Sequence, residues 1–232
     1  MPAFSLAKWY LDCVTDEGEA VIAYRAELRW GAVAIGYASV LRHREKTEVR
    51  STLRACPLPE LRGDELLWEA PPLRIEGRWR ALAPAARETV SQGVDWICVQ
   101  PRSEVELRLD GRTLRGLGYA EELKLTVPPW KLPIDELRWG RWVAKDRGLV
   151  WIDWRGPHSK KVSIGGEPSE LALDEGRVLR SGAIGETALS IIPDLHKVFP
   201  GRIVGLHETK WLARGRIGSS EGWAIHEIVK WP

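Results

Sequence analysis

The segment GLGYAEELKLTVPPWKLPIDELRWGRW, residues 116–142, brings together residue types that could do chemistry. Tyr119 and the carboxyl group of Glu121 precede a proline-broken loop, and Trp139 and Trp142 follow it. A carboxyl group can give or take a proton, and aromatic faces can stabilise the cation that a proton transfer creates. The same residues could equally have a structural role where two parts of the fold meet. The segment is therefore either a functional site or a structural junction.

An upstream segment resembles this one closely enough to suggest an internal duplication. Residues 10–31 can be laid on residues 119–140 without a gap, at an offset of 109 residues, and the word Glu-Leu-Arg-Trp-Gly then recurs. Tyr10 falls on Tyr119, and Asp12 falls on Glu121. A period of this length indicates tandem domains rather than a solenoid. The alternative is that both segments contain, by chance, the same short sequence at the end of a strand. If Tyr-x-acid opens both halves, its first role is structural, and a site would be a refinement in the second domain.

The elements that must position these residues are strands. Short runs of alternating apolar residues, bounded by turn residues, dominate the chain and are typical of antiparallel β-structure. Only residues 192–199 have the periodicity of a helical turn. The turn signal Leu-Asp-Gly-Arg at 109–112 lies close to the boundary that the duplication implies. The sequence therefore predicts an all-β chain of two barrels or sandwiches, residues 1–110 and residues 111–232.

Composition narrows the class of protein. The 34 basic and 32 acidic residues are interspersed, so no net field exists that would attract a nucleic acid or an anionic membrane surface. The three cysteines, Cys13, Cys56 and Cys98, are far apart and read as reduced, structural residues. No signal peptide or transmembrane segment is visible, which predicts a cytoplasmic protein of undetermined oligomeric state. The 13 tryptophans indicate barrel cores or a ligand cavity.

Four motifs carry a resemblance to a known family. They are KWYLDCVTDEGEAVIAYRAELRW near the start, GLGYAEE and LRWGRW in the middle, and GWAIHEIVKW at the end. In this order they resemble the lipocalin-like family of carotenoid 1,2-hydratase, hydroxyneurosporene synthase and the AttH-like proteins and, more distantly, tocopherol cyclase. The resemblance implies two tandem lipocalin-like antiparallel β-barrel domains of the calycin type. The chain departs from the pattern where Glu121 replaces an expected Asp, and where Trp139-Gly140 follows that acid only after the proline loop.

The family's activity implies a role for each candidate residue. Hydration or cyclisation of an isoprenoid begins with protonation of an alkene, and an apolar wall keeps a carboxylic acid protonated near neutral pH. Glu121 is the candidate acid, with Tyr119 and Asp153 as further candidate catalytic residues. The candidates for substrate binding are the three tryptophans Trp139, Trp142 and Trp154 and the two histidines His207 and His226. Strand alternation predicts that Trp139 and Trp142 face opposite ways, as do His226 and Glu227. The structural alternatives are a hydrogen-bonded carboxylate for Glu121 and core packing for each tryptophan.

These readings leave three hypotheses for function. The first is a cofactor-independent hydratase, cyclase or isomerase acting on a hydrophobic, isoprenoid-like or polyketide-like small molecule. The second is a non-catalytic binder or carrier of such a molecule, and the third is a structural protein whose tryptophans fill its own interior. The five histidines show no spacing suited to a metal, and no phosphate-binding or dinucleotide fingerprint occurs. The sequence leaves open hydration against cyclisation, and which domain holds a site.

Overall fold

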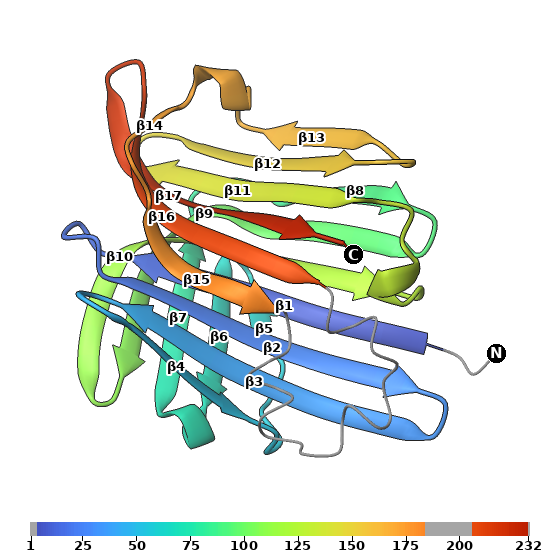
Figure 1. The fold of residues 1–232 in the computed structure, drawn as a ribbon. Coiled ribbons are helices and arrows are strands. Elements are labelled where there is room, and N and C mark those ends of the chain that lie inside the picture. Colours follow the sequence, from blue (N-terminus) through green and yellow to red (C-terminus); the bar gives the residue numbers. More distant parts are fainter. Residues whose placement is uncertain (1–3, 184–205, 232) are drawn as a thin grey trace. The chain divides into compact units, whose positions relative to one another are not determined.

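A computed structural model describes residues 4–183 and 206–231 (Figure 1). The regular structure of the described residues is almost entirely antiparallel strand, which confirms the all-β prediction. The chain divides into two compact units, Met1–Pro128 and Pro129–Pro232, each with its own sheet. The segment 192–199, predicted to hold a helical turn, lies outside the described residues. No helix in the described part of the chain is long and apolar enough to cross a membrane.

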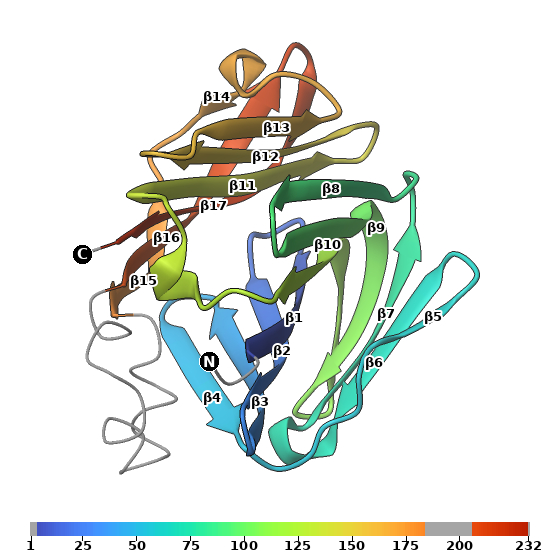
Figure 2. The same cartoon turned by 90° about the vertical axis from the view of Figure 1, so that its right-hand side faces the viewer.

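The first unit contains a ten-stranded antiparallel sheet in the order β4-β3-β2-β1-β10-β9-β7-β6-β5, with β8 paired to β9 (Figure 2). A short 3-10 helix, η1 (Pro71–Leu73), joins β6 to β7. The strands are β1 (Phe4–Val14), β2 (Ala20–Trp30), β3 (Val33–His43), β4 (Thr47–Thr52), β5 (Glu60–Arg62), β6 (Glu65–Ala70), β7 (Ile75–Ala81), β8 (Ala86–Ser91), β9 (Val94–Leu109) and β10 (Arg112–Leu125).

The second unit contains a seven-stranded antiparallel sheet in the order β13-β12-β11-β17-β16-β14, with β15 paired to β16. Its two 3-10 helices are η2 (Pro129–Lys131) and η3 (Pro168–Glu170). The strands are β11 (Glu136–Ala144), β12 (Gly148–Arg155), β13 (Lys160–Ile164), β14 (Ala172–Leu173), β15 (Arg177–Ala183), β16 (His207–Ile217) and β17 (Ser220–Lys230).

The two units repeat one arrangement, because the first strand of each pairs with both the second and the last. Strand β1 pairs with β2 and β10, and β11 pairs with β12 and β17. The last strand approaches the first through a glycine in both units. A Cβ on Gly116 would meet the carbonyl oxygen of Val14, and a Cβ on Gly222 would meet that of Val143. Glycine is needed at such close approaches of two backbones.

The pairing of β1 with β10 gives a different interpretation of the 109-residue alignment. Tyr10 and Tyr119, which the alignment equates, lie on β1 and β10, and these are neighbouring strands of one sheet. The structural repeat instead equates β10 with β17. The turn at 109–112 is the hairpin between β9 and β10, in which Asp110 and Gly111 both have positive φ, rather than a boundary between domains. The chain divides after Pro128 because β10 pairs with β1 and β9 of the first unit.

Each unit has a core in which tryptophans are buried with their indole N–H groups bonded to backbone. In the first unit Trp79 donates to the carbonyl of Asp12 at 2.7 Å, and in the second Trp142 donates to that of Gly215 at 2.9 Å. These bonds let a large aromatic ring fill a core without leaving a polar atom unsatisfied. The three cysteines are all buried and free, as the sequence predicts.

Candidate functional site

The motif Gly118-Tyr119-Ala120-Glu121 lies in the middle of β10, directly beside β1. In the register of these strands Tyr119 pairs with Asp12, and Glu121 pairs with Tyr10. Gly118 makes this approach possible, because a Cβ there would meet the carbonyl oxygen of Asp12. The glycine of the motif therefore sets the distance between two strands that each carry a tyrosine and an acid.

The four paired side chains share one face of the sheet. Direct partners in an antiparallel pair point the same way, and residues two apart on a strand do so too. A hydrophobic core cluster of the first unit lies on the other face, where Leu11 and Ala120 point. All four side chains are nevertheless buried: Tyr10 is 2% exposed, Asp12 1%, Tyr119 0% and Glu121 7%. Two tyrosines and two carboxyl groups thus form a buried polar quartet, which we call the Tyr–acid quartet.

The carboxyl group of Glu121 is held by two donors on one oxygen. The hydroxyl of Tyr119 donates to Oε2 at 2.7 Å, and the indole N–H of Trp96 donates to the same atom at 2.5 Å. Trp96 lies on β9 and is itself buried. An indole nitrogen can only donate, so its bond fixes Oε2 as an acceptor. The three side chains come from two adjacent strands, β9 and β10.

Tyr119 remains a phenol over a wide pH range. Burial is the main cause that raises the pKa of Tyr119 well above its usual value, and the neighbouring Cys98 and Glu121 add to it. Burial likewise raises the pKa of the Cys98 thiol. Because charged forms are disfavoured at both positions, the hydroxyl of Tyr119 stays available as a donor to Glu121.

Trp96 was not among the residues predicted from sequence, and the register explains why. Counting from the β9–β10 hairpin, where Leu109 pairs with Arg112, would place Gln100 opposite Glu121. Irregularities between Gly118 and Glu121 shift the register, so Cys98 is the actual partner and Trp96 comes within reach. A bulge of this kind leaves no fixed signature in a single sequence, so spacing alone could not find Trp96.

The remaining predicted residues all lie in the second unit, on both faces of its sheet. The strand register confirms that Trp139 and Trp142 point to opposite faces, as His226 and Glu227 do. Trp139 and Trp154 share one face, and the other carries Trp142, which belongs to the core of the unit. Trp154 is buried with its ring edge against His158 at 5.9 Å.

The polar candidates of the second unit are dispersed along the face that carries Trp142. Asp153 forms an ion pair with Arg155 at 2.7 Å, and its Oδ1 is buried with no hydrogen-bond partner in the described structure. His226 stacks on Trp211 at 5.1 Å, and burial, aided by the charge of Lys210, lowers its pKa. His207 is exposed at the start of β16. Among the predicted catalytic residues, the structure brings together Glu121 and Tyr119.

A buried charge cluster occupies the place in the second unit that corresponds to the Tyr–acid quartet. Glu227 on β17 pairs with Trp139 on β11, just as Glu121 on β10 pairs with Tyr10 on β1. Lys210, only 1% exposed, forms ion pairs with Glu227 and with Glu208, the latter at 3.1 Å, and its Nζ lies 5.5 Å from the centre of the Trp139 ring. The two units therefore place an acid at the same position, but the second neutralises it with a lysine.

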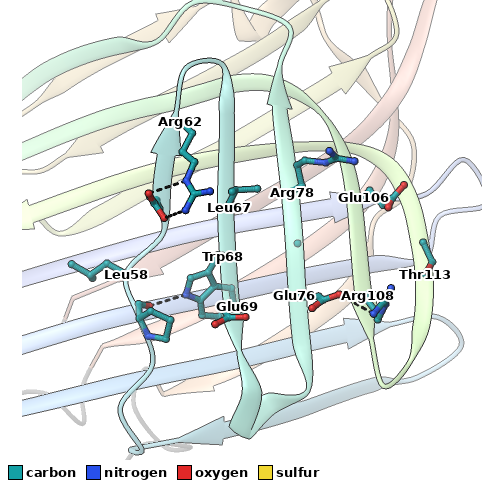
Figure 3. A pocket seen from close by; sticks show the side chains of 13 residues that line it. Leu58, Arg62, Leu67, Trp68, Glu69, Glu76, Arg78, Glu106, Arg108 and Thr113 are labelled. Atoms are coloured by element: carbon teal, nitrogen blue, oxygen red, sulfur yellow. Dashed lines mark hydrogen bonds and ion pairs between the residues drawn. The ribbon is translucent and has the colours of Figure 1, made fainter.

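A groove lined by described residues lies elsewhere in the first unit, with a volume of about 510 Å³. Figure 3 shows charged side chains along β5, β6, β7 and β9, with Arg62 bound to Glu60 and Arg108 to Glu76. Its lining includes none of the predicted site residues. The described residues contain no group of three or more acidic, histidine or cysteine side chains that could hold a metal ion.

Several solved structures have a fold similar to that of this chain. One is CghA with Sch210972, with a TM-score of 0.63 and 12% sequence identity over 98% of this chain and 88% of that chain. CghA alone gives a TM-score of 0.62 at the same identity. The AttH-like protein NE1406 of Nitrosomonas europaea gives 0.55 at 10% identity, over 99% of this chain and 93% of that chain. No protein-family model and no curated protein sequence matches the chain. At the level of the fold, these likenesses confirm the lipocalin-like, AttH-like resemblance read from the sequence.

Proposed function

We propose that the protein is a cofactor-independent enzyme that transfers a proton to a hydrophobic small molecule, in a hydration, cyclisation or isomerisation. The observation that carries this proposal is the carboxyl group of Glu121, buried and oriented by Tyr119 and Trp96. The likeness to CghA, solved with Sch210972, supports a small molecule as the substrate of this fold. An isoprenoid-like or polyketide-like compound with a trisubstituted alkene suits the chemistry of such an acid.

In the proposed reaction, Glu121 gives its proton to one carbon of the alkene. The π electrons form the new C–H bond, the O–H bond of the carboxyl group breaks, and a tertiary cation remains on the other carbon. The carboxylate that forms already has two donors on Oε2, so its charge is stabilised without rearrangement of the site.

This reading explains why the chain buries a carboxyl group that two other side chains orient. Burial of an acid is unfavourable unless its hydrogen bonds are made, and a carrier of an apolar molecule gains nothing from it. In an enzyme, the same bonds fix the acid in a productive orientation.

The decisive variant is Glu121→Gln, which keeps the shape of the side chain and an acceptor oxygen but has no acidic proton. Glu122→Gln is a matched control, because Glu122 is the next residue on β10, faces the opposite way and pairs with Lys124 at 2.9 Å. The parent and both variants are incubated in D2O with a panel of linear isoprenoid alcohols and polyenes, and the products are analysed by mass spectrometry.

We expect the parent and Glu122→Gln to form deuterium-labelled product, and Glu121→Gln to be slower by about 10²- to 10⁴-fold. Native mass spectrometry of the same samples separates the alternatives. Retention of a compound without conversion, in the parent as in Glu121→Gln, would indicate a carrier. No retention by any of the proteins would mean that the Tyr–acid quartet is structural.

A further inference from the structure

We propose that Asp12 is the second acid–base group of this site and accepts the proton that the attacking oxygen loses. The inference rests on the proposed role of Glu121 and extends it with a residue that the sequence pattern assigned only to the start of a domain. It concerns the second half of the reaction, in which the attacking oxygen loses a proton. Hydration and ring closure by a hydroxyl group both require this second half.

The Tyr–acid quartet places its two carboxyl groups on one diagonal. Tyr10 is directly opposite Glu121, and Asp12 is directly opposite Tyr119, so the tyrosines occupy the other diagonal. The rings of Tyr10 and Tyr119 are in edge contact, with centroids 5.9 Å apart. Diagonal neighbours in such a pair are about 7–8 Å apart, with their Cβ atoms somewhat closer. Carboxyl groups about 6.5–9.5 Å apart leave room for a water molecule between them, and the proposal places Asp12 and Glu121 at a spacing of this kind.

The position of Asp12 is fixed from several directions. Its carbonyl oxygen accepts the indole N–H of Trp79 at 2.7 Å, and Gly118 lies so close that any side chain there would meet the same oxygen. Its side chain is 1% exposed, less than that of Glu121. These contacts fix the backbone of Asp12 beside the strand that carries Glu121, and a fixed backbone contributes to the preorganisation that a proton-transfer site requires.

The proposed proton path balances over the two carboxyl groups. Glu121 protonates the alkene and becomes a carboxylate, and the tertiary cation is attacked by a lone pair of water or of a substrate hydroxyl. The C–O bond forms, the oxygen then carries a positive charge, and its proton passes to the Asp12 carboxylate. One proton has moved from Glu121 to Asp12, and water or an alcohol has added across the double bond. Exchange with solvent returns both groups to their starting states.

The two roles make different predictions in D2O. With Asp12 unable to accept a proton, the cation can still form and can lose a proton back to Glu121, which leaves deuterium in the recovered alkene. With Glu121 replaced by Gln, no cation forms and neither exchange nor addition occurs. The test therefore compares Asp12→Asn and Glu121→Gln on farnesol and related linear prenols, with Asp16→Asn in the exposed β1–β2 turn as a control for the same chemical change.

We expect Asp12→Asn to lose about 10²-fold or more of the addition product while it keeps deuterium exchange into recovered alkene. Asp12→Glu, which retains a carboxyl group, should recover part of the product and also serves if the asparagine variant does not fold. Addition by folded Asp12→Asn at the parent's rate would overturn the role of Asp12 alone. Full activity of Glu121→Gln, or no exchange by the parent with any prenol, would overturn the proposed function and this inference with it.

Discussion

Replacing Trp96 by phenylalanine is expected to weaken catalysis far more than the same change at another buried tryptophan. The variant keeps a large apolar ring but removes the N–H that donates to Glu121 Oε2 at 2.5 Å. A hydrogen bond to a charged group contributes about 1.5–3 kcal/mol. If Trp96 stabilises the carboxylate that forms in the transition state, a loss of that size lowers kcat by roughly 10- to 100-fold, since about 1.4 kcal/mol corresponds to a factor of ten.

The matched control is Trp68→Phe. Trp68 is also buried in the first unit, and its indole N–H donates to the carbonyl oxygen of Pro57 at 3.0 Å, not to Glu121. Urea unfolding of both variants measures the stability lost, and turnover of the prenol panel measures kcat. We expect comparable losses of stability but a large loss of kcat in Trp96→Phe alone. Equal kcat values in the two variants would refute the role of Trp96 in holding the acid.

Two further predictions concern the quartet itself. Gly118→Ala should destabilise the protein by about 1–3 kcal/mol, because the added methyl group meets the carbonyl oxygen of Asp12. Gly36→Ala is the control, because the space around Gly36 is open. A similar urea midpoint for both variants would contradict the close approach of the two strands at Gly118. Above pH 10, the unfolded chain ionises Tyr119 whereas the folded protein, with the pKa of this residue raised, does not. The free energy of unfolding should therefore fall as the pH rises above 10. The fall should be about 1.4 kcal/mol per pH unit steeper in the parent than in Tyr119→Phe. Equal pH slopes of the unfolding free energy, measured with urea, would count against a buried phenol.

The sequence predicted the strands and the faces of individual residues well, because both follow from local rules. Alternation of apolar and polar residues has the same period as the side chains of a strand, so it predicted that Trp139 and Trp142 point to opposite faces. The motif Gly-Tyr-x-Glu also drew attention to Tyr119 and Glu121, which lie together and are hydrogen-bonded.

Features that depend on distant pairing could not be read in the same way. The Asp110-Gly111 turn was recognised as a turn, but its local chemistry does not reveal that the next strand returns to pair with β1. The partner of Glu121 depends on irregularities in the β9–β10 register, so Trp96 was missed. The alignment of Tyr10 with Tyr119 detected a real spatial relationship but misread neighbouring strands as equivalent ones.

The most direct test of the central claim is solvent-deuterium incorporation by the purified parent and Glu121→Gln, measured on the same linear prenols under the same conditions. The proposed acid chemistry predicts deuterium in the recovered alkene or in the product with the parent, and a loss of about 10²-fold or more with Glu121→Gln. Equal incorporation by both proteins, or none by either, would contradict the role of Glu121 as the acid.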